Sequence, residues 1–138
     1  QGQLKMKKYY LIKDLATLSG LSTDTIRFYE KRKLLHPSFR GDNNYRYYDE
    51  NILKRIIFIK RCRSLDLSLN EIERLIELEQ NPQQSCHEVN NMIDLHIQQT
   101  TDKIKELKNF KTQLQSLRSS CNQSNQIMDC EILKRLEA

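Results

Sequence analysis

The feature that most constrains the fold is a long stretch without helix breakers in the second half of the chain. After Pro82 neither glycine nor proline occurs up to Ala138, so a helix that begins here can continue for many turns. Apolar side chains recur along it at helical spacing: Ile93, Ile97, Ile104, Leu107, Phe110, Leu114 and Leu117. From Leu107 to Cys121 the steps alternate between three and four residues, which is the heptad spacing of a coiled-coil seam.

Such a helix cannot bury its apolar stripe within its own chain. A chain of 138 residues has room for one compact domain and an appendage. A helix of about 35 residues with a single stripe is therefore expected to pair with a second copy of itself. We expect a dimerisation helix over 83–120, opened by a capping box from Ser85 to Glu88. Residues 121–138 are then a loop and a short last helix that Asp129 caps.

The first half of the chain is expected to form short helices around a hairpin. The whole chain holds only three glycines and two prolines, so helices should dominate. A short amphipathic helix ends at Gly20, Ser22 caps a second helix, and Ser68 with Glu71 forms the capping box of a later one. Residues 36–48 combine Pro, Gly, Asp and Asn with aromatics, a pattern typical of a hairpin.

Charge and composition narrow the class of protein. The net charge is +5, and residues 1–78 carry 16 Lys and Arg against 10 Asp and Glu, so the excess lies in the first half. That excess is either an ordinary solvated surface or the footprint of a nucleic acid. No apolar run approaches the roughly 18 residues of a membrane span, so we expect a cytoplasmic protein with reduced thiols. Met6 is expected to be the native start, with Gln1 to Lys5 added before it.

The positions of Ala16, Gly20 and Ile26 suit a helix-turn-helix, which needs a small residue at the helix contact, a glycine in the turn and an apolar residue in the second helix. This spacing by itself is weak evidence for a helix-turn-helix, because it also occurs by chance. The motifs that follow it are more specific: Thr25-Ile26-Arg27-Phe28-Tyr29-Glu30, Leu34-Leu35 and Asn44-Tyr45-Arg46-Tyr47-Tyr48. Together they closely resemble the signature of the MerR family of transcription regulators, and the resemblance extends over essentially the whole chain from Tyr10.

The resemblance implies a mainly α fold with three parts. These are a winged helix-turn-helix DNA-binding domain at 8–78 (helix-turn-helix about 12–31, wing about 36–48), an antiparallel coiled-coil dimerisation helix and a short metal-binding tail. The residues that match the family's DNA contacts are Thr23, Asp24, Arg27, Tyr29, Arg40, Tyr45 and Arg46. Thr23 and Asp24 lie near the base edges, and the arginines and tyrosines suit phosphate. For Arg27 or Arg46 the alternative is a surface salt bridge, and for Tyr29 and Tyr48 it is core packing.

Two positions depart from the family pattern. Lys33 stands where a glycine usually precedes the two leucines, and Asn44 stands where a glycine often precedes the Tyr-Arg pair. Asparagine tolerates a positive φ. A lysine in the left-handed region costs about 1 kcal/mol, so either Lys33 is strained or the turn differs here.

Three of the four cysteines lie at the ends of the long helix. Cys86 and Cys121 are 35 residues apart, at the same heptad phase but about 50 Å apart along a helix. They cannot share a metal within one chain. In an antiparallel pair Cys86 of one chain lies beside Cys121 of the other, and Cys130 can fold back to the same place. Two equivalent three-thiolate sites result, suited to soft ions.

The sequence around these cysteines resembles the cadmium/lead branch of the family, over Cys86 to Asn90 and Asp129 to Leu133. The resemblance implies a homodimer on double-stranded promoter DNA that distorts the promoter for RNA polymerase when Cd²⁺ or Pb²⁺ binds, with Hg²⁺ or Zn²⁺ as other possible effectors. His87 is a weak candidate for a fourth ligand, and Cys62 is expected to be a packed thiol.

Three alternatives stay open from the residues alone. They are a mercury-responsive member of the same family, a thiol redox sensor in which Cys121 and Cys130 form a disulfide, and a zinc-stabilised coiled-coil adaptor. A coiled-coil adaptor would not explain the basic residues of the predicted wing. An enzyme is not expected, because no base–nucleophile pair or phosphate loop is visible beyond the cysteines.

Overall fold

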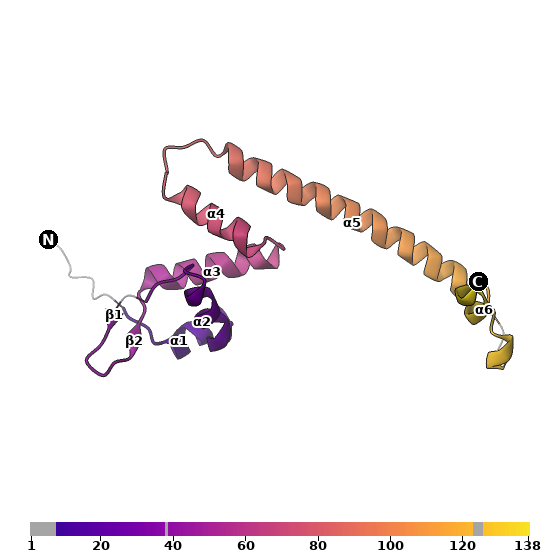
Figure 1. The fold of residues 1–138 in the computed structure, drawn as a ribbon, viewed down its shortest axis with the longest axis horizontal. Coiled ribbons are helices and arrows are strands. Elements are labelled where there is room, and N and C mark those ends of the chain that lie inside the picture. Colours follow the sequence, from indigo (N-terminus) through magenta and orange to yellow (C-terminus); the bar gives the residue numbers. More distant parts are fainter. Residues whose placement is uncertain (1–7, 38, 123–125) are drawn as a thin grey trace. The chain divides into compact units, whose positions relative to one another are not determined.

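The computed structural model describes residues 8–37, 39–122 and 126–138; Met6 as the native start lies outside these ranges. The chain divides into two compact units, with the boundary between Gln84 and Ser85. The first unit contains α1 (Ile12–Ser19), α2 (Thr23–Lys31), β1 (Phe39–Arg40), β2 (Arg46–Tyr47), α3 (Glu50–Ser64) and α4 (Leu69–Glu79). The second contains α5 (His87–Ser119), the 3₁₀ turn η1 (Ile127–Asp129) and α6 (Glu131–Glu137), as Figure 1 shows.

The helix-turn-helix forms as the local sequence predicts. Gly20 ends α1 at φ 75°, and its N–H donates to the Ala16 carbonyl at 2.9 Å. Ser22 caps α2, since its hydroxyl accepts from the Thr25 N–H at 3.1 Å. Ile26 is fully buried between the helices. The two predicted termini are therefore confirmed, and each follows from capping chemistry within a few residues.

The wing is a two-stranded antiparallel hairpin beside the first two helices. Phe39 pairs with Tyr47 and Arg40 pairs with Arg46 across it. The Phe39 and Tyr47 rings stack with centroids 5.2 Å apart. A backbone bridge between Tyr10 and Tyr48 ties the start of the described chain to the end of β2. The hairpin predicted over 36–48 is thus present, although its strands are only two residues long.

Helices α3 and α4 complete the first unit. Asp49 caps α3 through the Ile52 N–H, and Ser68 with Glu71 forms the predicted capping box of α4. The core draws on every helix of this unit and on the chain beside the wing, and its buried apolar residues are Tyr10, Leu15, Ile26, Tyr29, Leu34, Leu35, Tyr48, Ile56, Ile59, Cys62, Leu67 and Ile72. The expectation that Cys62 is a packed thiol is confirmed.

Three residues other than glycine have a positive φ among those described. Lys33 has φ 63°, Asn44 φ 65° and Asp66 φ 66°. At the first two positions the family that the sequence resembles usually has glycine. The backbone is left-handed there although this chain has Lys33 and Asn44 instead. Lys33 is the strained one, because asparagine tolerates this region and lysine does not.

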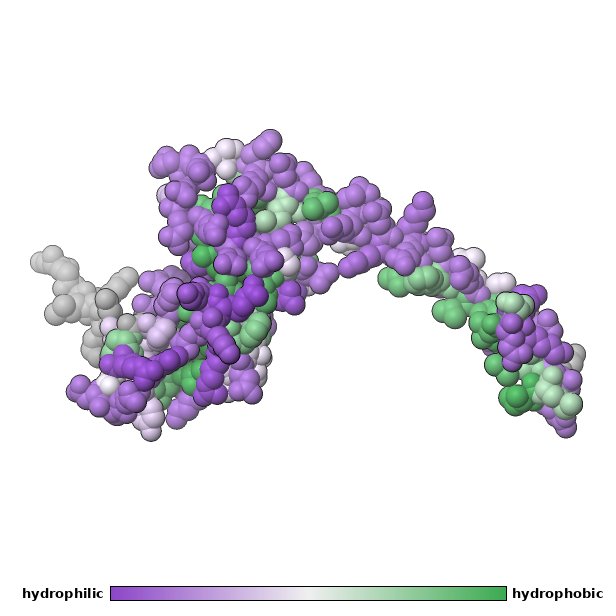
Figure 2. Space-filling model, in the orientation of Figure 1, coloured by the Kyte–Doolittle hydropathy of each residue, from purple (hydrophilic) through white to green (hydrophobic). Residues whose placement is uncertain are grey.

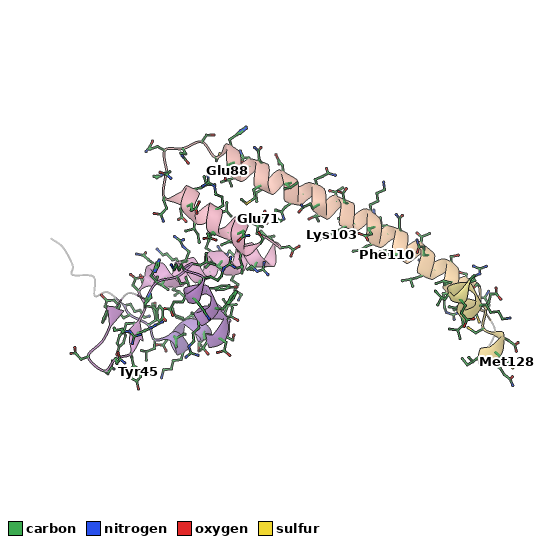
Figure 3. The ribbon with its side chains drawn as sticks, in the orientation of Figure 1. Tyr45, Glu71, Glu88, Lys103, Phe110 and Met128 are labelled. Atoms are coloured by element: carbon green, nitrogen blue, oxygen red, sulfur yellow. The ribbon has the colours of Figure 1, made fainter. Side chains whose placement is uncertain are left out.

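The second unit is built on α5, which is 33 residues long and buries none of its residues. Most of its seam is exposed, from 40% at Ile93 to 64% at Leu107 and Leu114, while Leu117 is half-buried. Figure 2 shows apolar side chains collected along one side of this helix, and Phe110 projects from it in Figure 3. Helix α6 contacts α5. None of the described helices combines the length and hydropathy of a membrane span.

Two predicted caps in this unit are wrong by one residue. Cys86, rather than Ser85, occupies the N-cap position of α5, and the Ser85 hydroxyl accepts from the His87 N–H. The helix therefore begins at His87, one residue later than a cap at Ser85 implies. Cys130, rather than Asp129, precedes α6, because the Asp129 N–H donates to the Gln126 carbonyl and closes η1 instead.

Candidate DNA interface and cysteine pair

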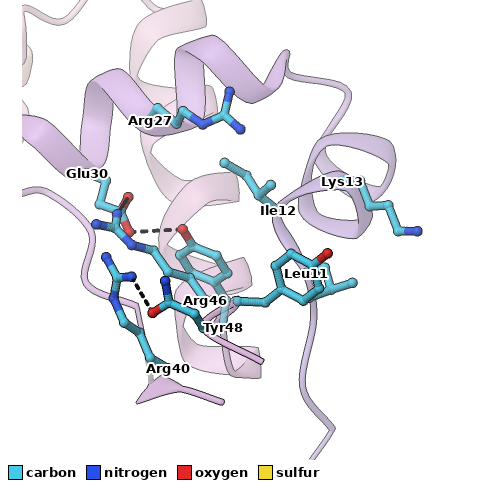
Figure 4. A pocket seen from close by; sticks show the side chains of 10 residues that line it. Leu11, Ile12, Lys13, Arg27, Glu30, Arg40, Arg46 and Tyr48 are labelled. Carbon is cyan, nitrogen blue, oxygen red and sulfur yellow. Dashed lines mark hydrogen bonds and ion pairs between the residues drawn. The ribbon is translucent and has the colours of Figure 1, made fainter. Parts of the chain in front are cut away.

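A cavity of about 710 Å³ opens between the start of α1, α2 and the wing. Ten residues line it: Leu11, Ile12, Lys13, Arg27, Glu30, Arg40, Asn44, Tyr45, Arg46 and Tyr48 (Figure 4). Four of these side chains are cationic and one is a carboxylate. A concave surface with this balance of charge attracts phosphate.

The structure brings four of the predicted DNA residues together at this cavity: Arg27, Arg40, Tyr45 and Arg46. Arg27 is 61% exposed and lies 3.5 Å from the Asp24 carboxylate. An exposed pair at that distance contributes little to stability, so the guanidinium can turn to another anion. Tyr45 is 62% exposed and lies at the wing in Figure 3.

The other three predicted residues lie outside the cavity. Asp24 is exposed at the start of α2, and Thr23 beside it is half-buried. Tyr29 is only 7% exposed and belongs to the core, which was the alternative interpretation from sequence. Tyr29 therefore packs into the core of the first unit and does not line the cavity.

Two arginines of the wing are held by hydrogen bonds. Arg40 Nη1 donates to the Asn44 side-chain oxygen at 3.0 Å, across the turn of the hairpin. Arg46 Nη1 donates to Glu30 Oε2 at 2.6 Å, and the Tyr48 hydroxyl donates to Glu30 Oε1 at 2.9 Å. Burial, then the hydrogen bond with Glu30, raises the pKa of Tyr48 to about 12. Tyr48 therefore remains a neutral hydrogen-bond donor throughout the physiological range.

Sequence reasoning missed Lys13 and Glu30 as residues of this surface, and it left Tyr48 undecided between a DNA contact and core packing. Lys13 lies in the first turn of α1, where nothing in the local pattern distinguishes it from any exposed lysine. Glu30 and Tyr48 were the last residues of two motifs that carry the family resemblance, and that position was the available signal. Their role depends on the packing of the wing against α2, which no local pattern shows.

The cysteines of the second unit lie at the two ends of α5. Cys86 is exposed at its first end, and Asn90 Nδ2 lies 3.7 Å from the Cys86 sulfur. Cys121 and Cys130 are half-exposed beyond its other end and share a side-chain hydrogen bond. The Leu133 N–H, with help from the Ile132 N–H and Cys121, lowers the pKa of the Cys130 thiol. The two thiols are thus neighbours, and the pKa of Cys130 lies below the ordinary value for a cysteine.

Within one chain these sulfurs do not form a complete metal site. No group of three His, Cys, Asp or Glu side chains close enough to hold an ion occurs in residues 8–37, 39–122 and 126–138. Cys86 and Cys121 are separated by the full length of α5, about 50 Å at 1.5 Å per residue. Cys62 is a different kind of thiol: it is buried in the first unit, and burial raises its pKa.

A winged helix-turn-helix with a cationic cavity between its recognition helix and its wing, joined to a long helix with an exposed seam, defines a DNA-binding transcription regulator. Comparison with known families agrees. The model of the MerR helix-turn-helix family of regulatory proteins matches residues 10–79, and the model described as MerR, DNA binding, matches residues 53–117. The chain belongs to the MerR family, whose members are DNA-binding regulators and not enzymes.

Individual relatives cover most of the chain. A probable heavy metal-dependent transcriptional regulator of Haemophilus influenzae is 39% identical over 125 residues, which is 91% of this chain and 97% of that protein. The ZntR homolog of the same organism is 40% identical over 104 residues, 75% of this chain and 77% of that protein. The crystal structure of the transcription regulator PbrR691 from Ralstonia metallidurans CH34 in complex with lead(II) is 40% identical, with a TM-score of 0.80, and the match covers 91% of this chain and 97% of that one.

Proposed function

We propose that the chain is a homodimeric, soft-metal-responsive transcription regulator with two three-thiolate sites. Each site takes Cys121 and Cys130 from one chain and Cys86 from the partner subunit. The observation that carries the proposal is the contact between Cys121 and Cys130 at one end of a helix whose other end holds Cys86. Antiparallel pairing of two such helices brings the third thiol to each pair.

The exposed seam of α5 supports the dimer. Several large apolar side chains in one stripe, each 40% or more exposed, are costly in a separate chain. A second copy offers the same stripe, so the pairing is self-complementary. We assign residues 8–78 to DNA binding, 83–120 to dimerisation and 121–138 to the metal-binding tail.

The donor set suits a soft ion. A thiolate triad without carboxylate oxygens favours Cd²⁺, Pb²⁺ or Hg²⁺ over Mg²⁺ or Ca²⁺. Such an ion, when bound, supplies bonds that join the tail of one chain to the helix of the other. Cadmium or lead is the preferred effector here, because one relative is described as heavy metal-dependent and another was solved with lead(II). Zn²⁺ and Hg²⁺ are the competing ions.

On DNA, the arginines at the cavity contact phosphates, and Tyr45 packs against the backbone. Thr23 and Asp24 lie at the start of α2, the part of a recognition helix that meets base edges. The dimer binds the promoter through both subunits, and binding of the effector then bends and twists the DNA so that RNA polymerase begins transcription. Each chain therefore supplies one half of the DNA contact and parts of both metal sites.

Mixed dimers test whether the metal sites are shared between chains. Cys86→Ser and Cys130→Ser should each abolish tight Cd²⁺ binding, because every site then keeps only two thiolates. Co-expression of the two variants gives heterodimers in which one end regains Cys86 opposite an intact Cys121–Cys130 pair. We expect one tight Cd²⁺ per heterodimer, measured by the ultraviolet thiolate-to-metal absorbance. Cys62→Ser, the matched control, should keep the binding of the unmodified protein.

A mixture shown to contain heterodimer but without a recovered tight site would refute the shared arrangement.

The adjacent Cys121 and Cys130 also favour a second candidate function, thiol redox sensing. A reporter promoter exposed to Cd²⁺, Pb²⁺, Hg²⁺, Zn²⁺ and hydrogen peroxide separates the two: activation by peroxide alone would identify a redox sensor, and the ranking of the ions would identify the effector.

A further inference from the structure

A carboxylate lies inside a cavity whose other charged side chains are cations. The Glu30 side chain is only 11% exposed, whereas Lys13, Arg27, Arg40 and Arg46 line the same cavity. A negative charge in a surface that meets phosphate weakens the attraction. Its presence there calls for a compensating role.

The contacts of Glu30 show what that role is. Both carboxylate oxygens are used: Oε2 accepts from Arg46 at 2.6 Å and Oε1 accepts from the Tyr48 hydroxyl at 2.9 Å. The two donors follow Glu30 by 16 and 18 residues and belong to the end of the wing. Glu30 itself belongs to α2, so one side chain ties the wing to the recognition helix (Figure 4). Tyr48 is 1% exposed, so its hydrogen bond anchors the Glu30 side chain to the core.

The free part of Arg46 faces the cavity. A guanidinium has five N–H donors, and Arg46 is 45% exposed although Glu30 holds one end of it. An unrestrained arginine loses about 2 kcal/mol of rotamer entropy when it is fixed on a ligand. Because Glu30 already restrains Arg46 in the free protein, less of that entropy is lost when DNA binds.

We propose that Glu30 is a positioning residue for DNA binding, which holds Arg46 in the orientation that meets a phosphate and keeps the wing in register with α2. The inference rests on the proposed DNA contact of Arg46. It predicts that removing the Glu30 charge changes the affinity for DNA in the direction opposite to the one expected from charge alone. Removing an acid from a phosphate-binding surface should tighten binding, but removing this acid should weaken it.

The test is a double-mutant cycle on the full-length protein. The variants are Glu30→Gln, Arg46→Ala and the combination of both. Glutamine has the shape of glutamate and can still accept from Tyr48, but it no longer offers Arg46 a charge. The probe is a short duplex selected from a random-sequence library by the unmodified protein. Affinity is measured by fluorescence anisotropy at a low salt concentration at which the Arg46→Ala variant still binds.

We expect E30Q to weaken binding about tenfold when Arg46 is present and not to weaken it when Arg46 is replaced by alanine. The matched control is Asp42→Asn, which removes one exposed acid from the turn of the same wing and should leave affinity unchanged or slightly higher. A general folding defect in E30Q would persist without Arg46, so the cycle separates positioning from loss of structure.

Three results would overturn the inference while leaving the DNA-binding function intact. They are unchanged or tighter binding by E30Q, an equal loss in the Arg46→Ala background, and an equal loss in D42N. If the unmodified protein selects no duplex at all, the DNA-binding function fails and this inference fails with it.

Discussion

Lys33 follows α2 and has a strained backbone. We therefore predict that exchanging Ala for Gly raises the stability of the protein at position 33 but lowers it at an ordinary helical position. Lys33 is exposed and has φ 63°. Its N–H donates to the Glu30 carbonyl at 2.9 Å, and the next N–H, of Leu34, donates to Tyr29 at 3.0 Å. These bonds hold the turn in the left-handed conformation whatever side chain stands there. Replacing Lys33 with Ala therefore keeps the cost of a Cβ at that φ and replacing it with Gly removes that cost, and neither change loses core packing.

The magnitude follows from two opposing effects. A Cβ in the left-handed region costs about 1 kcal/mol, which Gly removes and Ala keeps. Gly also gives the unfolded chain more freedom, which offsets about 0.5 kcal/mol of that gain. At position 33 the Gly variant should therefore be more stable than the Ala variant by about 0.5 kcal/mol. At Lys54, exposed within α3, Gly should be less stable than Ala by about 1 kcal/mol.

Urea denaturation of the four variants at one protein concentration measures the two differences. A fixed concentration is required because dimerisation makes the apparent stability depend on it. The comparison of Gly with Ala at each position removes the effect of losing the lysine charge. If Gly is less stable than Ala at position 33 by as much as at position 54, the backbone of the turn relaxes on substitution, and the strain argument is refuted.

Three further predictions concern the seam, the DNA contact and the core thiol. Leu114→Glu should dissociate the dimer in sedimentation, because it places a carboxylate in an apolar seam, whereas Thr112→Glu, off the seam, should not; a dimer in both variants would argue against the seam. Arg27→Ala should weaken binding to DNA of any sequence and reduce the slope of log affinity against log salt by about one unit, whereas a changed site preference at a constant slope would indicate a base contact. Cys62, buried and with a raised pKa, should be alkylated near pH 8 at least about tenfold more slowly than exposed Cys86, and equal rates in mass spectrometry would contradict its burial.

Much of the architecture was predictable from short-range patterns. The period of the apolar residues along α5 depends only on helix geometry, so the sequence alone indicates a long helix with one stripe. Gly20, Ser22 and the Ser68–Glu71 pair act within one turn, and all three were confirmed. At Lys33 the sequence left two possibilities open, a strained lysine or a different turn, and the structure shows the strained lysine. The wrong caps, at Ser85 and Asp129, are errors of one residue at helix starts that have no side-chain cap, and such boundaries are defined only to within one or two residues.

The candidate DNA surface was only partly predictable. Arg27, Arg40, Tyr45 and Arg46 were identified by their place in recognisable motifs, and the structure does place them around one cavity. The same motifs could not show that Tyr29 faces the core or that Lys13 comes to the cavity from another helix. Which face of a short helix is buried depends on what packs against it, and that is a property of the whole unit.

The sequence by itself determined features that depend on residues within one or two turns: the helices, the caps of the first unit at Gly20, Ser22 and Ser68, and the seam of α5. Only the tertiary structure decided which distant side chains meet. Glu30 joins Arg46 and Tyr48 because the wing folds back onto α2. The return of Cys130 to Cys121 was expected from the sequence, but the packing of α6 against α5 that accompanies it was not. The physical reason is that helix and turn signals are local, whereas a carboxylate finds its partners only after chain segments many residues apart have packed together.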